Sequence, residues 1–455
     1  MSQLASSMRE EEHLVESQTS EVAAPRILER PEHCLSRRLL SSNALKVLYR
    51  LHRSGYTAYL VGGSVRDVLL GHRPKDFDVA TNARPQEIRR LFRNSRIIGR
   101  RFRLAHVFFK GEIVEVSTFR ASPEAPDSPE DWEEERGDPA EEPVSVPDET
   151  AFGTPAEDAH RRDFTVNALF YDIASFSILD YVGGLEDLDG RLLRTIGPAE
   201  RRLEEDPVRM MRAVEYSARL DLRLADDLAA AIEDSAHLIT EAAPARLTYE
   251  LLEMMSSGRA QDICDGWRRF GILDAAFPEV ARSGSRLAPL LEEIDRRVRA
   301  RKRPPEGAIV ACLFLPRFLD ILETLRRPGS RLDNAELLGR LKEVVDPAGG
   351  RMHLSNNVVH LVKHGLFTQT KMWQPPERGR QVVKLARQEY FPVAWEVFSI
   401  GARAGLLPAD SWSAWSKALG RMQHAGARKS DESVEERPTR RRRRRPRRRA
   451  KRSQS

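Results

Sequence analysis

The sequence predicts an α+β fold in which strands come first and helices follow. Three observations support this. Short β-branched and aromatic runs bounded by glycines lie before residue 198. After that residue, apolar side chains recur almost everywhere at helical spacing. An acidic, proline-rich stretch at 121–150 interrupts the first part without matching either pattern. Strands followed by a run of helices are typical of an α+β head joined to a helical body.

The composition excludes several classes of protein. The 455 residues are 40% hydrophobic and 31% charged, which fits a soluble chain of about two to four domains. No segment approaches the roughly 18 apolar residues of a membrane span, and the acidic N-terminus has no signal-peptide core. The three cysteines form no C-x-x-C pair and are scattered at Cys34, Cys264 and Cys312. We therefore expect a cytoplasmic protein without disulfides or membrane contact.

The positive charge is concentrated in the last residues. The net charge is +6, but 437–455 alone holds 12 Lys and Arg and no acid, so the other residues carry −6. An arginine run cannot bury apolar surface and is expected to be disordered. Its charge predicts salt-dependent binding to nucleic-acid phosphates, although a solubility tail is the alternative.

The predicted elements of the first part follow in chain order. A helix is expected from Ser42, as its N-cap, to Gly55, because its apolar residues recur at helical spacing. The apolar run over 56–63 suits a buried strand that ends in two glycines. The next elements are a helix over 64–71, a strand over 75–81, a helix over 84–94 and a hairpin over 106–120 that turns at Lys110–Gly111.

Beyond the hairpin, residues 121–150 contain six prolines and 12 acids against one arginine, which predicts a mobile loop. Order is expected to resume at 151. Two short strands around glycine turns are predicted over 176–197. Helices are predicted from 199 to 420.

Two aspartates in "KDFDVAT" are the first candidates for chemistry. In a strand, Asp76 and Asp78 project on one face and Phe77 points to the other, into the core. Two carboxylates this close repel each other unless a cation lies between them. Mg²⁺ suits the position, because it binds one or two carboxylates and completes its shell with substrate phosphates. A solvated strand edge is the alternative.

A glycine pair lies at the end of the preceding strand. Gly62 and Gly63 precede a helix, and glycines allow a ligand to approach the backbone N–H groups at a helix N-terminus. Ser64 can add a hydroxyl donor, and Arg66 can neutralise phosphate. A tight turn without a ligand is the alternative, but the neighbouring D-x-D strand favours a phosphate site that faces a metal site.

Two residues compete for the position of a third acid. Glu115 lies on the hairpin, which could pack beside the D-x-D strand. Asp163 follows Arg161 and Arg162 at the expected start of a helix, where it could also be an N-cap. The sequence does not rank them.

A later helix carries an acid–base pair. Asp206 and Arg209 are three residues apart, on one helical face. An ion pair is the simplest interpretation. The functional one is base recognition, because an acceptor beside a donor complements adenine and cytosine and rejects uracil and guanine.

These motifs together resemble the bacterial class of template-independent nucleotidyltransferases that comprises poly(A) polymerases and tRNA CCA-adding enzymes. The matching segments span 36–285 and are "LVGGSVRDVLLG", "KDFDVAT", "RRDFTVNALFYD", "YVGGLEDLDGRLLRTIG" and "EEDPVRMMRAVEYSARL". "LFRNSRIIGRRFRLAHVFF" is similar to the poly(A) polymerase branch. The resemblance implies a polymerase-β-like head with a small mixed sheet, followed by helical neck, body and leg.

The implied organisation follows the motifs. It comprises a disordered extension over 1–35, the head over 36–198, a neck for RNA and base recognition over 199–285, a helical body and leg over 286–425 and a disordered basic tail over 426–455.

The resemblance also implies residue roles. Asp76 and Asp78 become the metal-binding catalytic acids, Asp163 is counted with them, and Glu115 remains a candidate third metal ligand. The implied nucleotide-binding residues are Gly62, Gly63, Ser64, Arg66, Asp67, Arg161, Arg162, Asn167, Asp206 and Arg209.

The implied reaction is transfer of AMP from ATP to RNA 3′ ends, with two Mg²⁺ ions and release of pyrophosphate. The expected partners are RNA 3′ ends, bound by the helical body and the basic tail, and the RNA-degradation machinery. The alternative is CCA or A addition to tRNA, because adenine and cytosine present the same pattern to Asp206 and Arg209.

Overall fold

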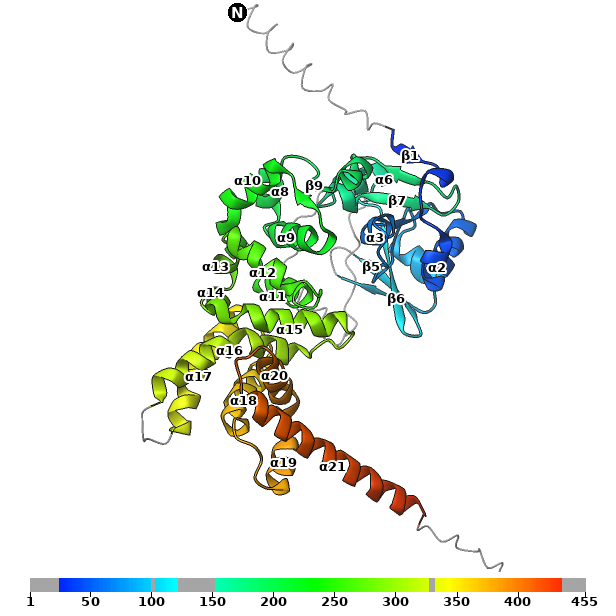
Figure 1. Cartoon of the computed structure of the whole chain (residues 1–455). Coiled ribbons are helices and arrows are strands. Elements are labelled where there is room, and N and C mark those ends of the chain that lie inside the picture. The colour runs from blue at the N-terminus through cyan, green and yellow to red at the C-terminus, as the bar shows by residue number, and fades with distance from the viewer. Residues whose placement is uncertain (1–23, 100–102, 122–151, 327–331, 436–455) are drawn as a thin grey trace, which may run out of the picture.

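A computed structural model describes residues 24–99, 103–121, 152–326 and 332–435 (Figure 1). The predicted α+β arrangement is confirmed, with a sheet-bearing head and a mostly helical remainder. We call residues 24–198 the head and 199–285 the neck. Most of the acidic stretch predicted to be mobile, and residues 436–455 of the predicted tail, lie outside the described residues. The expectation that the tail is disordered from 426 was wrong at its start, because residues 426–435 continue the last helix, Ala409–Glu435.

The head is built on one mixed sheet. Its eight strands lie in the order β1-β8-β7-β2-β3-β6-β5-β4, and β3 and β6 are the parallel neighbours. The strands are β1 Arg26–Leu28, β2 Ala58–Val61, β3 Asp78–Thr81, β4 Ser95–Ile98, β5 Leu104–Phe109, β6 Glu112–Thr118, β7 Leu169–Asp172 and β8 Ile178–Asp180. The predicted hairpin is β5–β6, with Gly111 in the left-handed region that its turn requires (φ 81°).

Helices cover one face of this sheet. They are α2 Ser42–Arg53, α3 Gly63–Leu69 and α4 Pro85–Leu91. Alternate residues of the central strands, such as Val79, Val114 and Val116, are fully buried in the core that α2 shares. The other face of β3 carries Asp78, and a second, smaller apolar cluster that includes Ala80 and Ala159 covers part of it.

Three expectations about the head were wrong in detail. Helix α2 is capped by Ser41 and not by Ser42, because the Ser41 hydroxyl accepts from two backbone N–H groups of the first turn. The strand predicted over 75–81 begins only at Asp78. Residues 24–35, expected to be disordered, contain β1, which pairs with β8 and extends the sheet.

The remaining elements are mostly helices, as predicted. They are α6 Pro155–His160, α7 Gly184–Asp189, α8 Ala199–Glu205, α9 Val208–Leu220, α10 Asp226–Ser235, α11 Pro244–Met254, α12 Ala260–Arg269, α13 Ile272–Ala276, α14 Pro278–Ala281, α15 Ala288–Arg299, α16 Glu306–Leu325, α17 Asn334–Arg351, α18 Asn356–Met372, α19 Gly379–Ala386, α20 Phe391–Arg403 and α21 Ala409–Glu435. The two strands predicted over 176–197 are β8 and β9 Leu192–Leu193. Strand β9 pairs in parallel with β10 Arg223–Leu224, a strand that the sequence did not predict.

The helical remainder buries its own core. Helix α16 is apolar on nearly all sides and packs against α17, α18 and α20. None of the helices in the described ranges combines the length and the hydropathy needed to span a bilayer.

Candidate active site

The predicted glycine turn lies between β2 and α3, and two guanidinium groups lie close to it. Gly62 has φ 68°, a conformation that favours glycine. A Cβ on Gly62 would lie 3.3 Å from Arg162 Nη1, and a Cβ on Gly63 would lie 3.2 Å from Arg66 Nη2. The two glycines therefore leave room for cationic groups against the backbone at the N-terminus of α3, which is an arrangement suited to phosphate.

The neighbouring polar side chains of α3 are already partnered. Arg66 is only 3% exposed and donates from Nε and Nη2 to Asp67 Oδ1 (2.8 and 2.6 Å) and from Nη1 to the Asn167 side chain. Ser64 donates its single hydroxyl hydrogen to the Val61 carbonyl (3.0 Å). The role of Ser64 as a phosphate donor stays a prediction; its hydroxyl would have to turn from the Val61 carbonyl to donate to a phosphate.

The catalytic aspartates of the prediction lie at the start of β3. Asp78 is the first residue of the strand, and Asp76 is exposed just before it. Phe77 is partly buried against the core, as expected. In the parallel β3–β6 pair, Asp78 is the register partner of Glu115, so both carboxylates project on the face away from α2.

The electrostatics of these acids show that they crowd one another. Burial, and next the negative charge of Glu115, raise the pKa of Asp78 to about 7; Asp76 adds to the effect and Arg162 opposes it. Adjacent carboxylates with this mutual repulsion fit a divalent cation, whose charge would relieve it. Within the described ranges, no three His, Cys, Asp or Glu side chains converge into a complete metal site.

Asp163, the other candidate for the third acid, has different partners. Its Oδ1 accepts from the Phe164 backbone N–H (2.8 Å) and Asn167 Nδ2 (3.0 Å), and its Oδ2 lies 2.9 Å from Arg212 Nη2. Burial would raise the pKa of Asp163, but Arg212 and these hydrogen bonds hold it below its ordinary value. Helix α6 ends at His160, so Asp163 does not start a helix as expected. The register pairing brings Glu115, and not Asp163, beside Asp78.

An acid that the sequence did not predict orients the arginine pair. Asp158 of α6 is fully buried. Its Oδ1 accepts from Arg161 Nε and Nη2 (2.9 and 2.7 Å), and its Oδ2 accepts from Arg162 Nη2 (2.9 Å). Burial would raise the pKa of Asp158, but Arg162 and Arg161 lower it. The i,i+3 and i,i+4 spacing across the end of α6 could have indicated these pairs.

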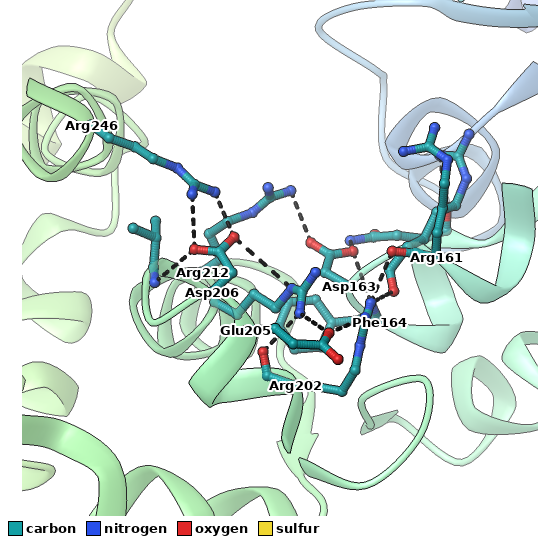
Figure 2. A network of polar contacts seen from close by, with 12 residues as sticks. Arg161, Asp163, Phe164, Arg202, Glu205, Asp206, Arg212 and Arg246 are labelled. Atoms are coloured by element: carbon teal, nitrogen blue, oxygen red, sulfur yellow. Dashed lines mark hydrogen bonds and ion pairs between the residues drawn. The ribbon is translucent and has the colours of Figure 1, made fainter. Parts of the chain in front are cut away.

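The proposed base-reading pair is arranged differently from the prediction. Asp206 lies between α8 and α9, so it does not share a helical face with Arg209, and their nearest charged atoms are 4.0 Å apart. Arg246 of α11 instead binds both Asp206 carboxylate oxygens (2.8 and 2.6 Å), as Figure 2 shows. Arg209 is buried and donates from Nη1 to the Arg202 carbonyl (2.7 Å).

Arginines of the neck connect this pair to the head (Figure 2). Arg202 donates from Nη2 to the carbonyls of Arg161 (2.9 Å) and Arg162 (2.6 Å). Arg212, one turn after Arg209 on α9, reaches Asp163. The sequence did not predict roles for Arg202, Arg212 and Arg246; the spacing of three between Arg209 and Arg212 was a local signal for Arg212.

A tyrosine of α9 completes the contact between neck and head. The Tyr216 hydroxyl accepts from Arg212 Nη2 (2.9 Å), and the Arg66 guanidinium lies 4.9 Å from the centroid of the Tyr216 ring. The glycine turn, the Asp163 segment and helix α9 therefore form one polar cluster.

Comparison with known families agrees with this geometry. The model described as "Poly A polymerase head domain" matches residues 58–194, and "Probable RNA and SrmB- binding site of polymerase A" matches 221–283. The chain is 36% identical to poly(A) polymerase I of Salmonella typhi over 83% of this chain and 82% of that protein. It is equally similar to poly(A) polymerase I of Escherichia coli O157:H7, at 36% identity over 84% and 83% of the two chains. The CCA-adding enzyme of Lactobacillus gasseri is 37% identical over 46% of this chain and 49% of its own.

Solved structures share the fold. The CCA-adding enzyme of Bacillus stearothermophilus in complex with CTP aligns with a TM-score of 0.59, at 24% identity over 83% of this chain and 82% of its own. The Thermotoga maritima CCA-adding enzyme complexed with tRNA aligns with a TM-score of 0.51, at 17% identity over 86% and 83% of the two chains.

Proposed function

We propose that this chain, which belongs to the poly(A) polymerase family, adds AMP from ATP to RNA 3′ ends without a template. This addition promotes RNA turnover. The observation that carries the proposal is the register pairing of Asp78 with Glu115, beside Asp76 and the glycine turn. In this proposal the paired carboxylates lie next to a loop that would bind phosphate, which is the arrangement that nucleotidyl transfer requires.

Asp76 and Asp78, with Glu115 as the third carboxylate, would hold Mg²⁺. Two such ions supply the activation of the RNA 3′-OH and the neutralisation of the leaving pyrophosphate. The chain itself positions the triphosphate. The Gly62–Gly63 turn offers backbone N–H groups, and Arg162, fixed by Asp158, places a cation beside them.

Asp163 is proposed to act through Arg212 as a positioning residue, since its carboxylate binds the neck. Arg66, Asp67 and Asn167 hold the inner side of the glycine turn by their mutual hydrogen bonds. Arg161 shares Asp158 with Arg162 and keeps that segment in place.

Selection of the base is proposed to lie with Asp206 and Arg209, where Arg246 fixes the carboxylate. An acceptor and a donor side by side suit adenine and cytosine alike. Adenine is favoured because the poly(A) polymerases match over 83% of this chain and the Lactobacillus gasseri CCA-adding enzyme over 46%. CCA addition to tRNA is the second candidate, on the strength of the solved structures that share the fold.

RNA is the proposed partner beyond the active site. The neck matches a family model for an RNA-binding site, and the 12 basic residues of 437–455 are suited to phosphates. We further propose a cytoplasmic location and contact with the RNA-degradation machinery.

Substitution of the acids tests the proposed chemistry. Asp76→Ala and Glu115→Ala should each lower incorporation of AMP by about 100-fold or more, while RNA binding without metal stays unchanged. Asp227→Ala, which removes an exposed acid of α10, is the matched control. Incorporation near the wild-type rate in Asp76→Ala would contradict the assignment of Asp76 as a catalytic metal ligand. The same result in Glu115→Ala would show that Glu115 is not the third metal ligand.

A further inference from the structure

The face of the head sheet that carries the catalytic acids extends beyond them in a straight row. Strand register aligns Arg96 of β4 with His106 of β5, His106 with Glu115 of β6, and Glu115 with Asp78 of β3. Residues paired in register point to the same side of a sheet. His106 Nε2 lies 3.4 Å from Glu115 Oε1, which confirms the alignment. One face therefore runs from the catalytic acids to an arginine three strands away.

Next to this row lies an exposed apolar pair. Phe108 and Ile113 are register partners in the β5–β6 hairpin, two residues from His106 and Glu115, so they share the same face. Phe108 is 38% exposed and Ile113 48% exposed. By contrast, Val107 and Val114, on the opposite face of the same hairpin, are fully buried. The strand pattern thus places large apolar side chains on the side of the hairpin opposite to the buried valines.

The neighbours of this pair are those of a nucleic-acid surface. The His106 ring lies edge-on to Phe108, with centroids 6.4 Å apart. Arg96 is exposed, and no ion pair joins it to any other residue in the described ranges. Aromatic rings stack on bases, while arginines contact phosphates or stack as well. A protein–protein hot spot would bury its anchors in an apolar patch with a polar rim, whereas this surface places the exposed guanidinium of Arg96 near aromatic rings.

The position of the pair fits one part of the substrate. Two residues of strand separate Ile113 from Glu115, which is about 7 Å. The proposed reaction needs the RNA 3′-OH beside Asp78 and Glu115, so the terminal base must lie within one nucleotide of these acids. The exposed pair lies at that separation along the same face.

We propose that Phe108 and Ile113 form a platform on which the 3′-terminal base of the RNA primer stacks, with Arg96 contacting a phosphate of the same strand. This inference rests on the proposed function, because it takes the catalytic acids as the destination of the 3′-OH.

The test measures primer binding separately from catalysis. A short oligoadenylate carries 2-aminopurine as its 3′-terminal base, and its fluorescence is titrated with the full-length protein in EDTA and without ATP. Phe108→Ala should weaken primer affinity about tenfold and reduce the change in fluorescence, because one base loses its stacking partner. Phe108→Trp should retain the primer affinity and the change in fluorescence. Arg96→Ala should weaken the primer affinity and lower its dependence on salt.

Leu39→Ala is the matched control. Leu39 is also a large apolar side chain, 51% exposed, but it lies in the short helical turn Arg37–Leu39 outside the sheet. Its removal should leave primer affinity unchanged. Thermal melts of all variants identify any loss of fold, and Phe108→Trp, which keeps the side chain large, shows whether the ring itself is what matters.

Unchanged affinity and fluorescence in Phe108→Ala and Ile113→Ala would overturn the platform. A change in sedimentation of these variants, with primer binding intact, would assign the surface to contact between copies and would overturn it as well. The proposed function fails separately. If Asp76→Ala keeps incorporation while Phe108→Ala loses the primer, the chemistry is misassigned and the platform stands.

Discussion

At the scale of single residues, the site depends on side chains that hold other side chains. Asp158 fixes Arg161 and Arg162, and Arg246 fixes Asp206. None of these supporting contacts involves the D-x-D aspartates directly. Two kinds of variant are therefore expected at this scale, those that lose stability and those that lose selection among nucleotides.

Asp158→Ala should destabilise the head. The change leaves two largely buried guanidinium groups without their counter-charge, which typically costs about 3–5 kcal/mol. Urea unfolding of the variant and of the exposed control Asp227→Ala measures this cost. The pKa of Asp158 is lowered in the folded protein, so its contribution is present above about pH 4 and fades as the pH falls below that value. An equal difference between wild type and variant at pH 7 and pH 3 would contradict this reasoning.

Arg246→Ala should relax the choice of nucleotide. Without the two hydrogen bonds from Arg246, the Asp206 carboxylate can turn away from the base, and the ratio of kcat/KM for ATP to that for GTP should fall about tenfold. Single-nucleotide extension with each triphosphate measures it. Arg340→Ala, which breaks an exposed pair with Glu343 on α17, should change nothing. An unchanged ratio in Arg246→Ala would remove Arg246 from base selection.

At the scale of elements, the site is made by a turn and a strand pairing. Gly62 and Gly63 follow β2 and begin α3, and β3 pairs in parallel with β6 to bring Asp78 and Glu115 together. The turn and the strands are local features. Their side-by-side placement in the sheet is not, because residues 82–114 separate β3 from the middle of β6.

Gly62→Ala tests the turn. The substitution forces an alanine into φ 68° and brings its Cβ to 3.3 Å from Arg162. Gly71→Ala is a close control, because Gly71 has φ 76° but no heavy atom near its Cβ. Both variants should lose about 1 kcal/mol of stability, but only Gly62→Ala should raise the KM for ATP. An equal KM in the two variants would show that backbone strain alone matters.

The sequence predicted the local part of this site and missed the long-range part. The helix that begins at Gly63, the β5–β6 hairpin and the position of Asp78 on the strand face opposite to Phe77 all follow from patterns within about ten residues. The pairing of Asp206 with Arg246 does not follow from such a pattern, because 40 residues separate them. Many other arginines could equally have been its partner. The three-residue β1 is too short to give a periodic signal and is fixed by its pairing with β8.

At the scale of the whole molecule, the head and neck meet through charge. Arg202 and Arg212 of the neck bind the segment 161–163 of the head, so the proposed sites for the triphosphate and for the base share one contact. The basic residues of 437–455 lie apart from this contact in the sequence. Binding of RNA and choice of nucleotide are therefore expected to be separable.

Truncation after residue 436 should weaken RNA binding and flatten its dependence on salt, because 12 cationic residues are lost. The rate of single-nucleotide addition at saturating RNA should not change. Binding titrations at several salt concentrations measure how RNA affinity depends on salt in the full chain and in the truncated one. Equal affinities at low salt would exclude the tail as a tether for RNA.

The most direct test of the central claim is extension of an unstructured RNA by the full-length protein with Mg²⁺ and each triphosphate alone. A polyadenylating enzyme should give a long ladder with ATP and little extension with CTP, GTP or UTP. Growth confined to tRNA, ending after two C and one A when ATP and CTP are both present, would contradict the proposed function and establish CCA addition in its place.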